Sequence, residues 1–421
     1  MIAVEHQPWL MAGPASGPES LEDHVRRLGP CPDGGDGLRA ALAESGLRGR
    51  GGARFPTSVK WDAVAERGRA VVVVNGAEGE PASWKDQLLL GLRPHLVLDG
   101  AVVAARSVGA RDVIVYVGEG FPHARAAVEE ALRERGGLRG PRVRLVEAPA
   151  RYVAGEESAA VSFLNGGEAK PRVVPPRPFE RGVAGRPTLV QNVETLAAAA
   201  LIARFGAAWF RSAGTAESPG TTLLTLRGAV TNPGVLEVPH GVSLADAVDR
   251  AGGRADEAVG VLVGGYFGTW LPGRWAASMP LDDRVLAGAR ASLGCGVVAV
   301  LPETACGVAE TSRVFGYLAR ESARQCGPCR VGLTALAEVL ADVAAGRATP
   351  EHGDRLRRWT AQLAGGRGAC KHPDGAVGFL RSAMDVFVED FENHLRLRPC
   401  RRSHREAALP VPAPALARGW R

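Results

Sequence analysis

Lysine is nearly absent from this 421-residue chain: only Lys60, Lys85, Lys170 and Lys371 occur among 51 basic residues. Because arginine supplies almost every positive charge, a retained lysine indicates a site that needs a compact point charge. Aromatic residues are also scarce, at 5%, and the arginines are scattered rather than gathered in one stripe. This pattern does not fit a nucleic-acid-binding surface, so no nucleic-acid partner is expected.

Long apolar runs are missing as well. The stretch Leu196–Ala203 is among the longest and falls short of the ~18 residues that span a bilayer. The first ten residues lack a basic region followed by an apolar core, so we expect no signal peptide. The sequence therefore predicts a cytoplasmic protein without a membrane span of its own, which is compatible with docking at the inner face of a membrane complex.

Seven cysteines are present, and in a reducing compartment they favour metal or redox roles over disulfides. Cys326 and Cys329 form a C-x2-C pair at an expected helix start, and Cys370 follows forty intervening residues later. This spacing is typical of iron–sulfur ligands. His372 and Cys306 are conceivable further ligands.

Two other interpretations of the Cys-Gly-Pro-Cys sequence stay open. It is also the dithiol of thioredoxin-like enzymes, but that chemistry expects a preceding β-strand, whereas a helix or loop precedes it here. A purely structural pair is the other alternative. Four further cysteines have no assigned role, and buried structural thiols are the default for them. They are Cys31, Cys295, Cys306 and Cys400.

A glycine-rich segment at residues 46–61 reads G-L-R-G-R-G-G-A-R-F-P-T-S-V-K-W. Its glycines permit positive φ and let a ligand lie against the main chain. Arg48, Arg50, Arg54 and Lys60 place positive charge at the same point, which suits a phosphate. A solvated loop without a ligand is the alternative.

Strands and helices alternate between residues 71 and 148, a pattern that predicts a doubly wound parallel sheet of Rossmann-like type. Ligands of such sheets bind beyond the carboxyl ends of the strands. Asn75, Glu78 and Glu80 follow one expected strand, and Gly118-Glu119-Gly120 follows the next. Polar groups therefore stand where a ligand is expected.

The whole chain divides into five predicted parts. Residues 1–45 are expected to be a weakly structured lead-in, and 46–215 the α/β domain. Residues 216–300 read as hairpin, helix and strand, typical of a β-grasp module. Residues 301–400 are helical, with Leu333, Leu336, Leu340 and Val343 on one face, and predict a four-helix bundle. Residues 401–421 are expected to be a disordered tail.

Six motifs in register resemble the NADH-binding flavoprotein subunit of respiratory complex I and of related NAD-dependent hydrogenases and formate dehydrogenases. They are the glycine-rich segment, N-G-A-E-G-E-P-A-S-W-K-D, Y-V-A-G-E-E-S-A, G-R-P-T-L-V-Q-N-V-E-T-L, E-S-A-R-Q-C-G-P-C-R and C-K-H-P-D-G-A. The resemblance implies an FMN-binding α/β domain, a ubiquitin-like module and a helical bundle that holds a [4Fe-4S] cluster.

The resemblance also implies a set of site residues. The phosphates of FMN and the dinucleotide would contact Gly49, Arg50, Gly51, Gly52, Ala53 and Lys60. Asn75, Glu78 and Glu80 would line the flavin and nicotinamide. The pocket would be closed by Tyr152, Gly155, Glu156 and Glu157, and the phosphate end of the flavin held by Asn192 and Thr195. Glu80 and Glu157 are the predicted catalytic residues, although acids at a helix N-terminus are an alternative role for Glu156 and Glu157.

The activity implied is hydride transfer from NADH to FMN, followed by single-electron transfer to an iron–sulfur cluster. The expected partner is a thioredoxin-like [2Fe-2S] subunit or a ferredoxin, within or outside a larger membrane-associated redox complex. A catalytically degenerate scaffold subunit and a thiol–disulfide oxidoreductase are the alternatives.

The chain departs from the family pattern at several positions. Ala323 stands where the first cluster cysteine is usual, which leaves a [3Fe-4S] cluster, a [4Fe-4S] cluster with a non-cysteine ligand, or no cluster. Ala77 replaces a usual Asp, Arg54 the third loop glycine, and Arg177 an aromatic residue. The preference between NADH and NADPH therefore stays open.

Overall fold

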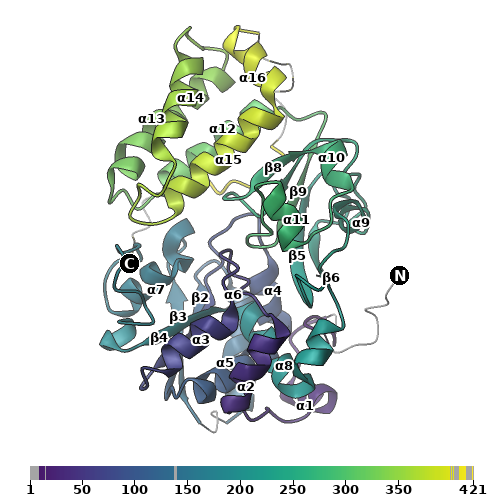
Figure 1. Ribbon diagram of the computed structural model, residues 1–421, viewed down its shortest axis with the longest axis vertical. Coiled ribbons are helices and arrows are strands. Elements are labelled where there is room, and N and C mark those ends of the chain that lie inside the picture. Colours follow the sequence, from purple (N-terminus) through teal and green to yellow (C-terminus); the bar gives the residue numbers. More distant parts are fainter. Residues whose placement is uncertain are drawn as a thin grey trace.

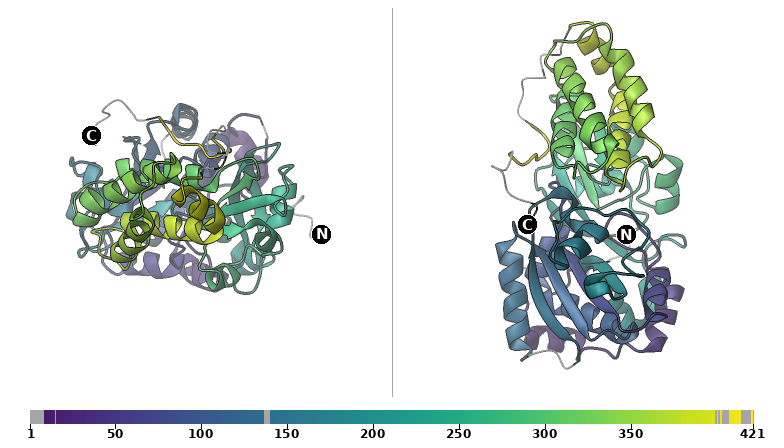
Figure 2. Two further views of the ribbon diagram at one scale, coloured as in Figure 1. Left: turned by 90° about the horizontal axis from the view of Figure 1, so that it is seen from above. Right: turned by 90° about the vertical axis from the view of Figure 1, so that its left-hand side faces the viewer.

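A computed structural model describes residues 9–14, 16–136, 140–398, 400, 402, 407–413 and 420. It has three structural units, with the α/β unit at the bottom of Figure 1, a mixed sheet at the right and a set of helices at the top. The side view in Figure 2 shows the helices standing above the α/β unit.

The α/β unit is built on four parallel strands in the order β3-β2-β1-β4. They are β1 (Val71–Gly76), β2 (Asp112–Gly118), β3 (Arg142–Ala148) and β4 (Thr188–Asn192). Runs such as Val71–Val74 are fully buried because helices cover both faces. The predicted parallel sheet is confirmed.

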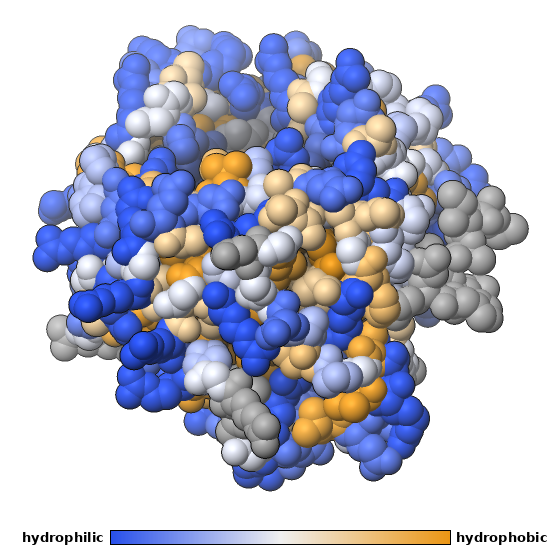
Figure 3. Space-filling model, turned by 60° about the horizontal axis from the view of Figure 1, so that its bottom comes forward, coloured by the Kyte–Doolittle hydropathy of each residue, from blue (hydrophilic) through white to orange (hydrophobic). Residues whose placement is uncertain are grey.

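Six helices accompany this sheet, and Figure 3 shows that the lower face of the molecule is mainly hydrophilic with smaller hydrophobic areas. The helices are α3 (Thr57–Ala65), α4 (Lys85–Leu92), α5 (Pro94–Ser107), α6 (Pro122–Glu134), α7 (Glu157–Leu164) and α8 (Val193–Arg211). A short 3-10 segment, η1 (Tyr152–Gly155), precedes α7, and another, η2 (Val183–Gly185), precedes β4.

Helix α8 corrects one expectation from the sequence. Among the described residues, its segment Val193–Phe210 is long and apolar enough to cross a membrane by length and composition, and 67% of it is buried inside the fold. Helices α4 and α5 pass the same test only if counted as one span, and they are bent by 97°. The apolar residues of α8 pack against α5 and against α2, the helix at Asp36–Ser45.

The N-terminal region is more ordered than predicted. It carries α1 (Leu21–Leu28), capped by the Ser20 hydroxyl, in addition to α2. The side chain of Trp9 is 4% exposed and stacks on Trp209, with the ring centroids 4.3 Å apart. The weakly structured lead-in was therefore a wrong prediction over residues 21–45, because these residues cover the apolar face of α8.

The middle unit is a five-stranded mixed sheet in the order β6-β5-β9-β7-β8. Its strands are β5 (Thr221–Gly228), β6 (Gly234–Pro239), β7 (Ala258–Val263), β8 (Thr269–Pro272) and β9 (Val297–Pro302). The helices are α9 (Leu244–Asp249), α10 (Gly273–Ala277) and α11 (Asp283–Gly288). The predicted hairpin, helix and strand occur in the predicted order.

The third unit is helical, as predicted. It contains α12 (Gly307–Arg320), a π-helical turn η3 (Pro328–Leu333), α13 (Thr334–Ala344), α14 (His352–Leu363), α15 (His372–Val386) and α16 (Val388–Leu395). The predicted apolar face of Leu333, Leu336, Leu340 and Val343 is fully buried.

Part of the predicted disordered tail is packed. Leu409 is 2% exposed, and the backbone amides of Ala408 and Leu409 each donate to the Glu310 carboxylate at 3.1 Å. Further along, the carbonyl of Trp420 accepts from the Ala169 amide at 2.9 Å, and its ring lies under the Arg151 guanidinium. The described tail residues therefore touch both the helical and the α/β units, while Arg401 and Arg405 lie outside the described residues.

Candidate functional site

Two asparagines stand side by side at the carboxyl edge of the parallel sheet. Asn75 at the end of β1 is in register with Asn192 at the end of β4. The Asn75 amide donates to the Gly155 carbonyl at 2.8 Å, and the Asn192 side-chain oxygen caps α8 by accepting from the Glu194 amide at 3.0 Å. Strand order reverses between β1 and β4, and this is the point where such sheets bind ligands.

The glycine loop closes over this edge. The Gly49 amide donates to the Phe55 carbonyl at 2.9 Å, and the Arg50 amide donates to the Thr195 hydroxyl at 2.8 Å. Gly52 has φ +110° with open space around its Cα, and a Cβ on Gly51 would lie 3.4 Å from Asn192. The loop backbone is therefore held at both ends and accessible in the middle, at Gly51, Gly52 and Ala53.

Two buried polar atoms beside the loop lack a partner within the described ranges. They are the Thr57 hydroxyl at the start of α3 and the Gln191 side-chain oxygen on β4. A Cβ on Gly49 would lie 3.9 Å from the amide nitrogen of Gln191, which places this side chain against the loop. Orphaned polar groups beside a glycine cradle and a helix start fit a phosphate-bearing cofactor such as FMN.

The loop arginines differ from the expectation that they offer charge to a phosphate. The Arg50 side chain is 3% exposed and reaches into the middle unit, where it donates to His240 Nε2 at 2.6 Å and to the Thr221 carbonyl at 2.9 Å. Arg54, at φ +49°, pairs with Asp283 at 2.5 Å. These arginines tie the loop to the middle unit, and Arg50 contributes its backbone rather than its charge to the loop surface.

Lys60 lies on α3 with its ammonium group on the crevice side of the loop. Its Nζ is 2.8 Å from Glu157 Oε2, and both side chains are partly exposed, at 24% and 30%. A partly exposed pair can exchange protein contacts for ligand contacts. Two predicted site residues that are far apart in the sequence therefore meet here.

Two of the predicted carboxylates cap helices. Glu156 accepts from the Ser158 and Ala159 amides at 3.0 and 3.1 Å, so it is the N-cap of α7. Glu78, at φ +36°, accepts from the Asp86 and Gln87 amides at 2.9 and 3.0 Å at the start of α4. Both carboxylates are engaged by backbone amides, which matches the helix-terminus alternative for Glu156.

Glu80 lies at the contact between the α/β and middle units and is 8% exposed. Its carboxylate accepts from the Tyr266 amide at 2.7 Å, the Ala82 amide at 3.2 Å and the Tyr152 hydroxyl at 3.1 Å. Burial raises the pKa of Glu80 to about 7 despite these hydrogen bonds. The group can therefore exist in either protonation state near neutral pH.

The sequence did not reveal that Cys295 lies at the same place. Its thiol donates to the Gly264 carbonyl at 3.3 Å, and a Cβ on Gly265 would lie 2.6 Å from its sulfur and 2.7 Å from the Glu80 carboxylate. Burial, and then the charge of Glu80, raise its pKa well above the ordinary value. The adjacent glycines Gly264 and Gly265 were the only local signal of a tight turn here.

A buried ion cluster beneath the crevice was also missed. Lys85 is 2% exposed, and its Nζ lies 2.6 Å from Asp86 and 2.9 Å from Glu194. Asn192 joins the cluster by donating to Asp86 at 2.6 Å. The rarity of lysine in this chain was a signal for Lys85, but its partners come from a separate element, α8.

The three predicted cluster ligands face one another. Cys329 is 3% exposed at the start of η3, and burial raises its pKa, with the charges of Cys326 and Cys370 acting in the same direction. Cys370 lies just before α15. Three convergent thiols fit an iron–sulfur cluster held by three cysteines.

Nearby, His372 at the start of α15 is 2% exposed. Its Nε2 is 2.8 Å from the Leu318 carbonyl, and its Nδ1 is buried without a partner within the described part of the chain. Burial lowers its pKa to about 4, so the ring is neutral at pH 7. A neutral imidazole with one free nitrogen is a competent metal ligand.

The segment η1 joins the crevice to the cluster motif. On one side the Gly155 carbonyl accepts from Asn75 and the Tyr152 hydroxyl donates to Glu80. On the other side the Tyr152 amide donates to Glu321 at 3.1 Å, and its ring lies 5.7 Å from that of His372. The two regions are therefore in direct contact through one residue.

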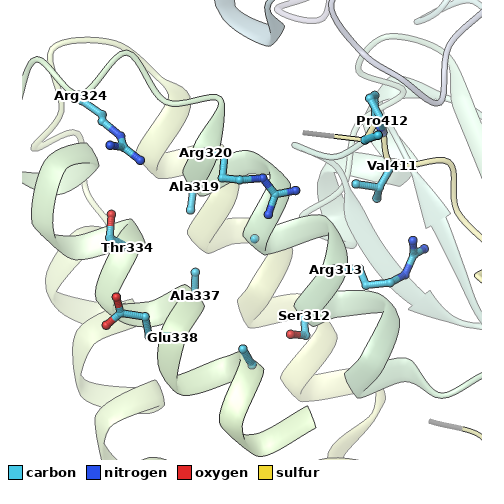
Figure 4. A pocket seen from close by; sticks show the side chains of 13 residues that line it. Ser312, Arg313, Ala319, Arg320, Arg324, Thr334, Ala337, Glu338, Val411 and Pro412 are labelled. Atoms are coloured by element: carbon cyan, nitrogen blue, oxygen red, sulfur yellow. The ribbon is translucent and has the colours of Figure 1, made fainter. Parts of the chain in front are cut away.

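A surface pocket of the helical unit lies away from the crevice. Its walls come from α12, α13 and the tail, and Figure 4 shows Arg320 and Glu338 on two of these walls with Val411 and Pro412 at one side. None of the predicted site residues lines it.

Three family models match the chain. Residues 42–201 match the Nuo51 FMN-binding domain, 223–264 the SLBB domain, and 309–394 the NADH-ubiquinone oxidoreductase-F iron-sulfur binding region. The NADH-quinone oxidoreductase F subunit of Streptomyces coelicolor is 35% identical over 401 residues, covering 87% of each chain. The chain belongs to the family of NADH-quinone oxidoreductase F subunits.

Other members of this family give the same result. A second such protein, numbered 2 in Rhizobium meliloti, is 34% identical over 87% of this chain and 90% of its own length. Among solved structures, an air-oxidised NAD+-reducing [NiFe]-hydrogenase matches with a TM-score of 0.80 at 34% identity over 93% of this chain, which spans 67% of the hydrogenase chain. The H2-reduced form matches with a TM-score of 0.78, and there the chain spans 62% of that chain.

Proposed function

We propose that this member of the family oxidises NADH with bound FMN and passes electrons singly to an iron–sulfur cluster in its helical unit. The observation that carries the proposal is the contact made by η1, since Tyr152 touches Glu80 in the crevice and His372 beside the cluster motif. Donor and acceptor centres built at these two places would lie next to each other in one chain. A scaffold role alone would not need this continuity.

FMN would occupy the crevice between β1 and β4. The backbone of Gly49, Gly51, Gly52 and Ala53, together with Thr57 and Gln191, would receive its phosphate end, and Asn192 and Thr195 would hold the loop in place. Bound FMN supplies the hydride-accepting chemistry. Asn75 and Gly155 would line the ring, while Glu78 and Glu156 act by holding the starts of α4 and α7.

NADH would approach from the side of Lys60 and Glu157. Opening this pair would free an ammonium group for a phosphate and a carboxylate for ribose hydroxyls. A carboxylate at that position disfavours an additional phosphate, which favours NADH over NADPH. Glu80 would hold a proton close to the flavin edge while Tyr152 and Tyr266 fix its orientation.

The cluster would be held by Cys326, Cys329 and Cys370, with a ligand other than cysteine at the position of Ala323. The helices α12–α15 around it would form the four-helix bundle of the family. The middle unit is proposed to be a ubiquitin-like β-grasp module, supported by its β5–β6 hairpin, its helix α9 and the parallel pairing of β5 with β9.

The electron acceptor beyond this chain would be a separate iron–sulfur subunit or a ferredoxin. The relatives named above are themselves subunits, which supports a multi-subunit redox complex docked peripherally at a membrane. The thiol–disulfide alternative is not favoured, because no strand precedes Cys326 directly among the described elements.

Reconstitution of the purified chain with FMN, iron and sulfide under anaerobic conditions tests the proposal. Addition of NADH should bleach the flavin absorption, and iron should be retained with the protein. Failure to bind FMN, or bound flavin that NADH does not reduce, would reject NADH oxidation and favour the scaffold alternative.

A further inference from the structure

A second group of metal-binding side chains lies in the helical unit, outside the crevice and the cluster motif. Cys306 Sγ, a ring nitrogen of His394 and Cys400 Sγ all lie within 4.8 Å of one another. Cys306 and His394 are 2% and 0% exposed, whereas Cys400 is partly exposed. The three come from separate places: the residue before α12, the last turn of α16 and the chain that follows α16.

The hydrogen bonds of His394 prepare one of its nitrogens to bind a metal. Nδ1 lies 3.1 Å from the Val343 carbonyl, which can only accept, so Nδ1 carries the proton. Nε2 then has a free lone pair, and it faces Cys306 Sγ at 3.5 Å and the Cys400 amide at 3.3 Å. A backbone carbonyl on the far ring nitrogen is the usual support of a metal-binding histidine.

The environment also favours thiolates. Cys306 is the N-cap of α12, where its sulfur accepts from the Ala309 amide at 3.4 Å, and a helix N-terminus stabilises negative charge. The guanidinium group of Arg402 lies in the same region, where it binds Asp390 at 2.7 Å and the Glu303 carbonyl at 3.0 Å. Two thiolates would therefore meet a helix terminus and a nearby cation.

The geometry points to a zinc-type site in which Cys306, His394 and Cys400 bind one divalent cation and water takes the fourth position. Two sulfurs and an imidazole nitrogen are the donors that Zn²⁺ prefers in proteins. Tetrahedral zinc places its S and N ligands about 3.5–3.8 Å apart. Cys306 and His394 already meet this spacing, and Cys400 needs an inward movement of about 1 Å at most.

This site is distinct from the cluster motif, because the two lie at opposite ends of α12. Cys306 precedes the first turn of the helix, and the segment with Cys326 and Cys329 follows the last turn. A helix of 14 residues separates its ends by about 20 Å. A bound cation would fasten the chain after α16 to the start of α12, just before residues 407–413 pack on Glu310.

Metal analysis of the full chain, purified without oxygen and incubated with zinc alone, tests the site. We expect one zinc per chain that survives desalting, and cobalt in its place should show thiolate-to-metal charge-transfer absorption. Cys400→Ser and Cys306→Ser should each weaken this binding by about 100-fold. Cys31→Ser, at a thiol in another unit, and Cys326→Ser, at the cluster motif, should leave it intact.

Three results would overturn the proposal. They are the absence of cobalt–thiolate absorption in the unmodified chain, its loss in Cys326→Ser together with its retention in Cys400→Ser, and a Cys306–Cys400 disulfide in the anaerobic protein. If Cys306→Ser does not fold, Cys400→Ser decides, because Cys400 is partly exposed and lies beyond the last helix. The assay uses neither FMN nor NADH, so its outcome is independent of the proposed oxidation.

Discussion

The α/β unit and the helical unit build their sites in different ways. In the α/β unit the candidate ligands follow strand ends and one glycine loop, so short motifs carry most of the information. In the helical unit the ligands come from segments that are far apart in the sequence, and one expected cysteine is Ala323. The comparison teaches that a site made from backbone edges survives sequence change more easily than a site made from a few side chains.

The largest expected effect concerns the ion cluster beneath the crevice. Lys85→Met removes the cation between Asp86 and Glu194 and leaves two buried carboxylates without their partner. We expect a loss of about 3–5 kcal/mol in the free energy of unfolding, measured by urea denaturation. Lys170→Met, which removes a lysine paired with the half-exposed Glu168, should cost about 1 kcal/mol or less. Equal losses in the two variants would contradict a special role for the buried cluster.

The next effect depends on pH and concerns Glu80. Its folded-state pKa of about 7 lies above the ordinary value of 4.5, so the unfolded chain releases this proton first as pH rises. Glu80 therefore lowers stability progressively between about pH 4.5 and 7. Glu80→Gln removes this contribution, and the stability of the variant relative to the parent should rise by up to about 3 kcal/mol across that window.

Urea denaturation at several pH values checks this prediction. Glu129→Gln, at a half-exposed carboxylate on α6, serves as the control and should show a flat difference. A flat difference for Glu80→Gln as well would mean that Glu80 is not held in a desolvated state.

A smaller effect concerns catalysis at the Lys60–Glu157 pair. Glu157→Gln should lower kcat/KM for NADH by about tenfold, or about 1.4 kcal/mol, while the melting temperature stays within a few degrees. Lys60→Gln should act similarly. The double variant should lose less than the sum, since the two side chains touch at 2.8 Å. Unchanged turnover in both single variants would remove this pair from the nucleotide site.

The smallest effect on the fold is expected from Ala323→Cys. The side chain is only partly buried, so stability should change by less than about 0.5 kcal/mol. The added thiol should nevertheless complete a four-cysteine cluster and change the electron paramagnetic resonance signal of the reconstituted protein. An unchanged signal and iron content would show that position 323 does not face the cluster.

Much of the architecture was predictable, because strand–helix alternation and the buried valine run of β1 are strong local signals. The meeting of Asn75 with Asn192 also followed from parallel pairing. The direction of the Arg50 and Arg54 side chains was not predictable, since their partners His240 and Asp283 belong to the middle unit.

The same limit applies wherever a contact joins distant segments. Composition predicted a disordered tail, yet the carboxylate of Glu310 on α12 binds two of its amides. The metal group of Cys306, His394 and Cys400 likewise combines residues without a motif. Local sequence reports backbone geometry well, and it does not report which remote side chain completes a site.

The most direct test of the account is freeze-quench electron paramagnetic resonance of the reconstituted chain after mixing with NADH under anaerobic conditions, beside the variant Cys329→Ser. The account predicts that NADH bleaches the flavin in both proteins and that a reduced-cluster change appears only in the parent. Flavin reduction without any change at the cluster of the parent would contradict electron transfer between the two units.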